Sequence, residues 1–269
     1  MAYLREPAVA GHFYPSDPVQ LRKDVISYLS PKTEAIHAIA CIAPHAGYVY
    51  SGAIAGAVFA RIEVPERCII LCPNHTGRGH PLSIMKTGGW RTPLGVVPID
   101  DQLANTLAGI FPGLIEDSTA HLFEHAIEVE LPFLQVERPD VRFIPIAIGT
   151  GQLMLLEHLG HAIAKAIQEA PGPVLIVASS DMNHYENDAT TRVKDRKAID
   201  RILALNPRGL HETVINESIS MCGFGPTVAM LTAARQLGAK KAELIQYATS
   251  GDVFGERDRV VGYAGIVIE

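Results

Sequence analysis

The fold is decided by AIACIAPHAGY at residues 38–48, followed by SGAIAGAVFARI at 51–62 and CIILCPNHTG at 68–77. The apolar runs that open the first and third stretches are short and continuous, as in buried parallel strands. The stretch between them predicts a helix whose small residues allow close approach to a sheet. A strand, a helix and a second strand predict a parallel βαβ unit.

The same alternation continues in both directions along the chain. Asp17 is the expected N-cap of a helix and Pro18 its first residue. A loop is expected around Trp90 and Pro93, and Pro132 should bend or break its helix. Helices are predicted at 16–29, 101–111, 125–135, 152–169, 187–204 and 226–237, and further strands at 82–86, 95–99, 141–149, 174–179, 243–250 and 260–268. We predict a single α/β domain over 1–269, with a mostly parallel central sheet and helices on both faces.

Composition narrows the class of protein. The chain has 269 residues, 48% of them hydrophobic, and a net charge of −6. It has no long run of Lys or Arg, so neither nucleic acid nor an anionic membrane is expected as the main partner. The N-terminal residues lack the uninterrupted apolar core of a signal peptide, and no stretch approaches 18 apolar residues. We therefore expect a cytoplasmic protein.

Cysteine spacing excludes two kinds of site. The four cysteines contain no CxxC pair, which argues against a zinc ribbon and a thioredoxin-like motif. Cys41, Cys68 and Cys72 lie in predicted strands and should act as small core residues. Cys222 differs, because it lies in the Gly-rich turn MCGFGP (221–226) that leads into a helix.

Histidines follow three of the predicted strands. His45 follows the first strand, His75 the second, and Asp181 and His184 follow the strand at 174–179. Ligands in open α/β sheets bind beyond the carboxyl ends of the strands. If these strands are parallel, the three imidazoles meet at one edge of the sheet. His45 and His75 are therefore candidate metal ligands, although a single strand-end histidine is more often an ordinary loop or capping residue.

His184 has three candidate roles. It could be a third metal ligand, a general acid or base, or a residue that orients a ligand. We favour a catalytic role outside the metal shell, together with Asp181. The candidate substrate-binding residues are Asn74, Tyr48 and His125.

The segment EHAIE (124–128) predicts the first turn of a helix with His125 and Glu128 on one face. This turn could belong to the site or be a solvated, acid-rich helix start. His80 and His121 lie in polar loops and are expected at the surface.

The Gly-rich turn at Cys222 invites two interpretations. Thiolates are favoured near helix N-termini and metals, which makes Cys222 a candidate ligand; it could also be a small residue that fits a tight turn. A Rossmann fingerprint is rejected, because Val228 stands where its last glycine should be. The chain has neither a Walker A motif nor a GxSxG elbow.

Seven motifs in order give the sequence a family resemblance. They are REPAVAGHFYPSDP (5–18), APHAGYVYSG (43–52), CPNHTG (72–77), TPLG (92–95), EHAIEVELPFLQ (124–135), SSDMNHY (179–185), and SGD with VVGYAGIV near the end. The chain resembles the Memo family, also called AmmeMemoRadiSam system protein B, over nearly its whole length. That family is similar in fold to class III extradiol dioxygenases, which hold Fe(II) with two histidines and a carboxylate.

The resemblance implies roles for four residues. His45 and His75 match the two histidine ligands of the dioxygenases, and His184 matches their acid–base histidine. Cys222 stands in place of the carboxylate and completes the implied His/His/Cys set. A thiolate ligand favours copper, zinc or iron–thiolate chemistry, so ring-cleaving activity is not expected. The resemblance also implies AMMECR-like and radical-SAM proteins as partners.

Three functions follow from these observations. The first is a redox enzyme that uses iron or copper on a small molecule in the strand-end cleft. The second is a non-catalytic adaptor that binds a peptide or partner protein in the same cleft. The third is a zinc hydrolase in which metal-bound water is activated.

Overall fold

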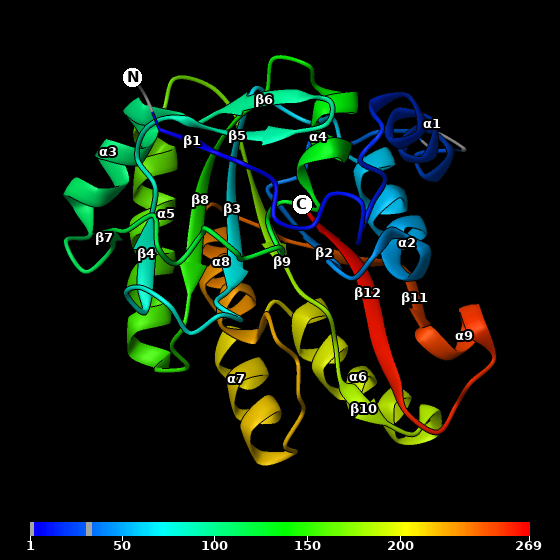
Figure 1. Cartoon of the computed structure of the whole chain (residues 1–269). Helices are drawn as coiled ribbons and strands as arrows, with labels where there is room; N and C mark the ends of the chain where they lie inside the picture. Colours follow the sequence, from blue (N-terminus) through cyan, green and yellow to red (C-terminus); the bar gives the residue numbers. More distant parts are fainter. Residues whose placement is uncertain (1–2, 31–33) are drawn as a thin grey trace.

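The centre of the fold consists of four parallel strands, and all of them come from apolar runs of the sequence. In the computed structural model, which describes residues 3–30 and 34–269, they are β2 (Ala40–Ala43), β9 (Val174–Ser179), β3 (Arg67–Pro73) and β8 (Arg142–Ile148). They lie in the order β2-β9-β3-β8, and every neighbouring pair is parallel (Figure 1). Their carboxyl ends therefore share one edge, as the sequence predicts.

Antiparallel strands extend both sides of this centre and make the sheet mixed. The added strands are β12 (Val260–Ile268), β11 (Ala242–Thr249), β10 (His184–Glu186), β4 (Leu82–Ile84) and β7 (Ile115–Glu116). On one side, β12 pairs antiparallel with β2 and carries β10 and β11; on the other, β4 pairs antiparallel with β8 and parallel with β7. The described residues thus form a nine-stranded mixed sheet with four adjacent parallel strands in its middle.

A second, smaller sheet corrects one prediction. It contains β1 (Leu4–Arg5), β5 (Gly89–Thr92) and β6 (Gly95–Pro98) in the order β1-β5-β6. Trp90, predicted in a loop, lies in β5 and is fully buried. The expected strand at 95–99 is β6, which forms a hairpin with β5. Pairing with the N-terminal β1 turns the expected loop into a strand, and local sequence does not reveal such a distant partner.

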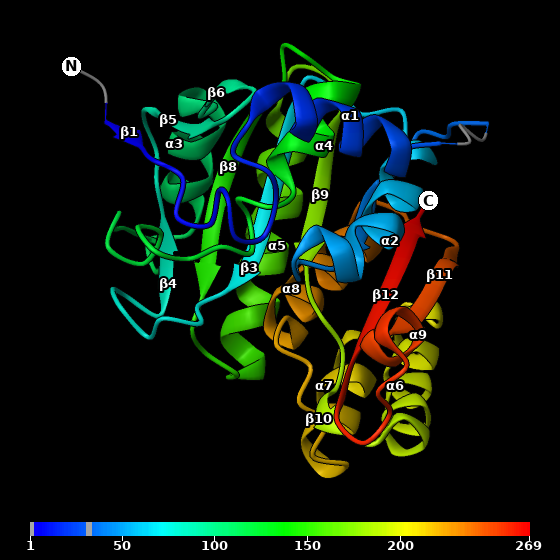
Figure 2. The same ribbon diagram turned by 45° about the vertical axis from the view of Figure 1, so that its right-hand side comes forward.

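Helices cover both faces of the main sheet. They are α1 (Pro18–Tyr28), α2 (Tyr48–Ala60), α3 (Asp101–Ile110), α4 (Leu131–Glu137), α5 (Leu153–Glu169), α6 (Asp188–Leu203), α7 (Pro207–Asn216), α8 (Phe224–Gln236) and α9 (Ser250–Phe254). On one face α8 packs against β2, β3 and β9, with α5 packed on α8; α2 covers β2, β11 and β12 on the other (Figures 1 and 2). Gly160 allows the close approach of α5 to α8, since a Cβ there would lie 2.5 Å from the carbonyl oxygen of Ala229.

Two helix predictions need correction. The helix expected at 125–135 begins only at Leu131, and the preceding residues form turns. Pro132 lies in the first turn of α4, where its missing N–H costs nothing, so it starts the helix instead of bending it. α7 was not predicted, although Asn206 caps it and Pro207 is its first residue. Asp17 caps α1 as expected, by accepting from the backbone N–H of Gln20.

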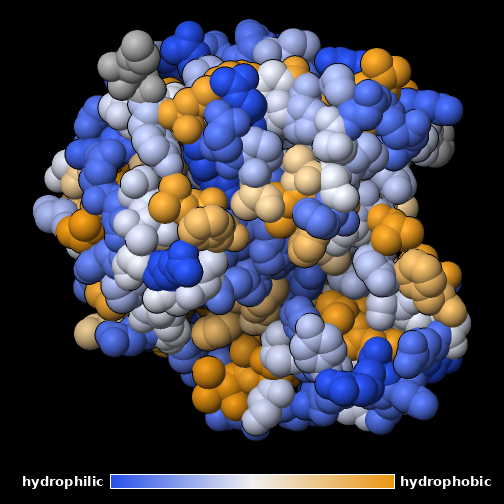
Figure 3. All heavy atoms as spheres, in the orientation of Figure 1, coloured by the Kyte–Doolittle hydropathy of each residue, from blue (hydrophilic) through white to orange (hydrophobic). Residues whose placement is uncertain are grey.

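One hydrophobic core extends through these layers. It includes Cys41, Cys68 and Cys72, which are fully buried, as predicted for small core residues. The face seen in Figure 3 is mostly hydrophilic, with hydrophobic side chains in scattered patches. None of the helices in the described part of the chain has both the length and the apolar character needed to cross a membrane.

Candidate metal centre

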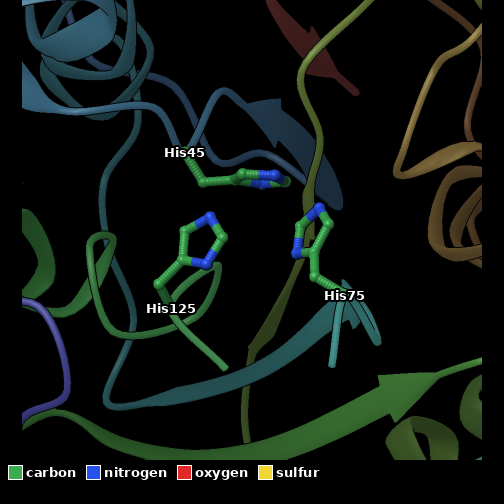
Figure 4. Close-up of side chains that lie close together, drawn as sticks. All are labelled: His45, His75 and His125. Carbon is green, nitrogen blue, oxygen red and sulfur yellow. The ribbon is translucent and has the colours of Figure 1, made fainter. Parts of the chain in front are cut away.

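Three imidazoles converge at the carboxyl edge of the sheet. His45 follows β2, His75 follows β3, and His125 comes from the turns before α4 (Figure 4). One ring nitrogen of each lies within 4.8 Å of the others. The rings of His45 and His75 have centroids 5.2 Å apart, and those of His75 and His125 are stacked at 4.8 Å. Tetrahedral donors around a metal lie about 3.3 Å apart at typical bond lengths, so a small adjustment of these rings would close a site.

His45 is held from behind by a serine. The His45 side chain is buried, and its Nδ1 lies 2.8 Å from the Ser179 hydroxyl. Burial lowers the pKa of His45 well below its usual range, and the neighbouring histidines lower it further. The ring is therefore neutral, and its Nε2 remains available towards the other imidazoles. A neutral imidazole with one nitrogen fixed by a hydrogen bond is the common form of a metal ligand.

Glu124 holds His75 in the same way. Its buried carboxylate lies 2.9 Å from Nδ1 of His75 and accepts the backbone N–H groups of His75, His125 and Ala126. Burial acts to lower the pKa of His75, but the Glu124 carboxylate raises it above its usual value. For His125, burial dominates and lowers the pKa. A carboxylate behind a ligand histidine fixes its tautomer and ring orientation.

The turns that carry His125 are tied to the N-terminal segment by a buried ion pair. Arg5 Nη1 donates to Glu128 at 2.8 Å, and both side chains are buried. Glu128 also accepts the backbone N–H groups of Ala8 and Val9 and the hydroxyl of Tyr14. Arg5 adds bonds to the carbonyl oxygens of residues 121 and 124. This network fixes the backbone on which His125 stands.

Cys222 lies beside the imidazole cluster. Its Sγ is 3.3 Å from Nε2 of His45 and accepts the backbone N–H of Asp181. Burial raises the pKa of the thiol, and the Asp181 carboxylate raises it further. The start of α8 was expected to lower the pKa of this thiol, but burial has the larger effect and raises it. Without a metal the thiol is therefore protonated. Gly223 permits this arrangement, since a Cβ there would collide with the Ser180 side chain.

Asp181 and His184 line the space next to the cluster. Asp181 accepts the backbone N–H of His45 at 2.9 Å, and burial raises its pKa to about 7. Nδ1 of His184 lies 2.8 Å from the carbonyl oxygen of Ser220. Tyr185 follows with a φ of 63°, a costly conformation for a residue with a side chain, at the irregular register of β10.

One pocket of about 1060 Å³ is lined by the three imidazoles and by Asp181, His184 and Cys222. That is the upper end of the range for small-molecule sites. Aromatic rings dominate its walls, and Arg259 reaches it from the loop before β12. The aromatic lining residues are Phe13, Tyr14, Tyr28, Tyr48, Tyr50, Tyr185 and Tyr263. The site therefore combines three imidazoles that could hold a metal with room for an organic ligand.

Comparison with known proteins identifies the family. The family model described as Memo-like protein matches residues 5–267. The chain belongs to the Memo family. It is 43% identical to a MEMO1 family protein of Methanopyrus kandleri, with 98% of each chain covered, and 41% identical to one of Methanocaldococcus jannaschii, with both chains covered completely.

A solved structure shares the fold of this Memo-family chain. It is an uncharacterized protein of Escherichia coli K12, 13% identical, with a TM-score of 0.58 over 85% of this chain and 98% of the other. At that identity the likeness concerns the fold alone. The family resemblance and the α/β fold class inferred from sequence are both confirmed.

In the structure of this Memo-family protein, the residues that cluster are not the set of metal ligands predicted from the sequence. His45 and His75 meet as expected, but the third imidazole is His125, which was predicted to bind substrate. The hydroxyl of Tyr48 donates to the carbonyl oxygen of Val129, although its ring lines the pocket. Asn74 bonds within its own loop, to the carbonyl oxygen of Arg78. The roles of Cys222, His184 and Asp181 remain predictions.

Three buried residues between positions 121 and 130 of this Memo-family chain were missed or misplaced. Glu130 lies in the predicted helix and Glu124 just before it, and neither gave a distinct signal. His121 was expected at the surface but is fully buried, with its ring 5.8 Å from Trp90; burial lowers its pKa to about 4. The contacts of Arg5 with this loop explain the burial, and they join residues more than a hundred positions apart.

Proposed function

We propose that the chain is a metal-dependent redox protein in which His45, His75 and His125 hold iron or copper beside a small organic molecule. The convergence of three imidazoles in the lining of an aromatic pocket supports this proposal most directly. Imidazole donors suit iron, copper, nickel and zinc. A bound iron or copper ion would supply one-electron chemistry at this position.

The residues around the cluster fit a metal. His45 and His75 are both hydrogen-bonded at Nδ1, so Nε2 is the nitrogen of each ring that could bind the metal. Cys222 is the candidate fourth donor, because its Sγ lies next to Nε2 of His45. A soft sulfur ligand also favours a redox-active metal over magnesium or calcium.

Two residues of the pocket would handle protons. With Nδ1 facing the carbonyl oxygen of Ser220, His184 presents Nε2 to accept a proton from a bound molecule. Burial lowers the pKa of His184, so the ring is in the accepting form at neutral pH. Asp181 has a pKa of about 7 and gains or loses a proton near neutrality.

Metal analysis of anaerobically purified protein tests the proposal. We expect close to one iron or copper per chain, with optical or electron paramagnetic resonance signals that change on reduction. His125→Ala should remove most of the metal, while alanine at His211, whose imidazole bonds the carbonyl oxygen of Gly151 outside the cluster, should leave it unchanged. Protein that retains no metal above trace would contradict the proposal.

A zinc hydrolase is the second candidate. Three histidines with an open fourth position are a known form of catalytic zinc site. Stoichiometric zinc without redox-active metal, together with hydrolysis of a model ester, would favour it. Absence of both metal and turnover would favour an adaptor that binds a peptide in the pocket, whose neighbouring surface exposes Tyr50 and Phe254.

We also propose a cytoplasmic location and contacts with AMMECR-like and radical-SAM proteins, both on the strength of family membership. Affinity capture from cells that express the tagged chain, followed by mass spectrometry, would test these partners. A variant with the pocket blocked, such as Ser250→Trp at its lining, would show whether capture depends on the pocket.

A further inference from the structure

A buried carboxyl group lies behind the metal centre, one hydrogen bond away from a ligand histidine. Glu130 has no exposed surface, and its Oε1 lies 2.9 Å from the Ser179 hydroxyl. The same hydroxyl lies 2.8 Å from Nδ1 of His45 and 2.7 Å from the carbonyl oxygen of Ala126. Ser179 therefore has three hydrogen-bonding partners.

The protons of this cluster can be counted. A serine hydroxyl has one proton to donate and two lone pairs that accept. The carbonyl of Ala126 can only accept, so it needs the hydroxyl proton. The two remaining contacts are satisfied only if both partners donate to Ser179. Nδ1 of His45 must then carry a proton, and so must Oε1 of Glu130.

An ionised Glu130 would leave one of the oxygen–oxygen contacts of Ser179 without a proton. If Glu130 were ionised, its carboxylate and the Ala126 carbonyl would compete for the single proton of Ser179. One of the two oxygen pairs, at 2.7 or 2.9 Å, would then be repulsive in a site shielded from water.

The surroundings of Glu130 agree with the neutral form. Among the residues that the structure describes, none bonds its Oε2. Burial raises the pKa of this carboxyl group well above its usual range; the Ser179 bond acts in the opposite direction, and the nearby Asp181 raises the pKa further. A buried carboxylate without a charged partner is strongly unfavourable, whereas the neutral acid is not.

We propose that Glu130 is a protonated positioning residue that acts through Ser179 to keep His45 in the tautomer with Nδ1 protonated and Nε2 facing the metal centre. By donating to Ser179, Glu130 occupies one lone pair of the serine, so that the serine proton goes to Ala126 and the second lone pair accepts from Nδ1 of His45. The ring then cannot accept at Nδ1, so Nε2 keeps the lone pair that a metal needs. The effect on metal binding rests on the proposed function, whereas the protonation pattern does not.

Two measurements on the metal-free protein test the protonation pattern. Nitrogen-15 NMR of histidine-labelled protein, with His45 assigned by the loss of its signals in His45→Asn, should show a protonated Nδ1 and an unprotonated Nε2. Infrared difference spectra against Glu130→Gln should show the carbonyl stretch of a carboxylic acid at pH about 9, where Asp181 and Asp195 are ionised. A His45 signal protonated at Nε2, or the absence of the acid band, overturns the proposal.

Variants then test the positioning role. Ser179→Ala should shift His45 towards the other tautomer and weaken zinc(II) binding about 10–100-fold. Glu130→Gln should preserve both properties, because its amide N–H donates in place of the acid. The matched control is Ser83→Ala, which removes another fully buried strand serine whose hydroxyl donates to a backbone carbonyl.

The outcomes separate the two proposals. If wild-type protein binds no metal, the proposed function fails, while the tautomer and the acid band still decide the role of Glu130. If Ser179→Ala leaves both the tautomer and the zinc affinity unchanged, the positioning role is overturned even if metal binds.

Discussion

Arg5→Met should destabilise the protein strongly, although Arg5 lies outside the metal centre. The substitution leaves Glu128 as a buried carboxylate without its cation, and breaking a buried pair in this way costs about 3–5 kcal/mol. Ala8, Val9 and Tyr14 still donate to Glu128, which places the expected loss at the lower end of that range.

Urea unfolding measures this loss. Far-ultraviolet circular dichroism follows the whole chain, and fluorescence follows Trp90, the only tryptophan, whose ring lies 4.0 Å from the Arg5 guanidinium. Arg208→Met is the matched control, because Arg208 pairs with Glu157 at the surface with its side chain 69% exposed. The control should cost far less, because water and salt screen a surface ion pair.

A second substitution tests the electrostatic cause. Glu128→Gln in the Arg5→Met background removes the unpaired charge but keeps an acceptor for the N-terminal N–H groups, so it should recover part of the stability. A loss below about 1 kcal/mol for Arg5→Met, or no recovery in the double variant, would refute the reasoning.

Three further predictions concern the pocket and its surroundings. Glu124→Gln should lower metal affinity about 10–100-fold, measured by zinc titration, because the charged acceptor behind His75 is lost. His184→Ala should retain the full metal content but lose turnover; loss of the metal would make His184 a ligand. Burial raises the pKa of Asp195 to about 6, above its value in the unfolded chain. The folded protein therefore binds this proton more tightly than the unfolded chain does. The resulting stabilisation is present at low pH and is lost as the pH rises through about 6. The free energy of unfolding of Asp195→Asn, measured by urea titration and compared with that of wild type, should therefore be up to ~3 kcal/mol more favourable at pH about 8 than at pH about 4. The same difference from wild type at both pH values would contradict this prediction.

The parts of the site that follow from strand order could be predicted from the sequence. His45 and His75 end two apolar runs, and parallel pairing through β9 brings those ends to one edge. The same rule places His184 beside the same pocket. These predictions depend only on the periodicity of the strands and on a general property of α/β sheets.

The parts of the site that depend on distant loop contacts could not be predicted. His125 joins the cluster because Arg5 and Glu128 hold its turns against the N-terminal segment. In the sequence, the same residues form an amphipathic pattern that predicts a helix from residue 125. Pro132 decides where that helix begins, but the pattern alone does not show that the preceding turn unwinds.

The buried ion pair between Arg5 and Glu128 also limits when the N-terminal segment can fold during synthesis. Residues 5–14 leave the ribosome well before the carboxylate that receives them, which is 123 positions later in the chain than Arg5. The N-terminal segment therefore lacks its hydrogen-bonding partners while β2 and β3, the strands that precede His45 and His75, are being synthesised. The backbone around His125 can assume its final shape only after the two ends of this long span have met. If His45, His75 and His125 hold a metal as proposed, it should bind only after most of the sheet has been translated.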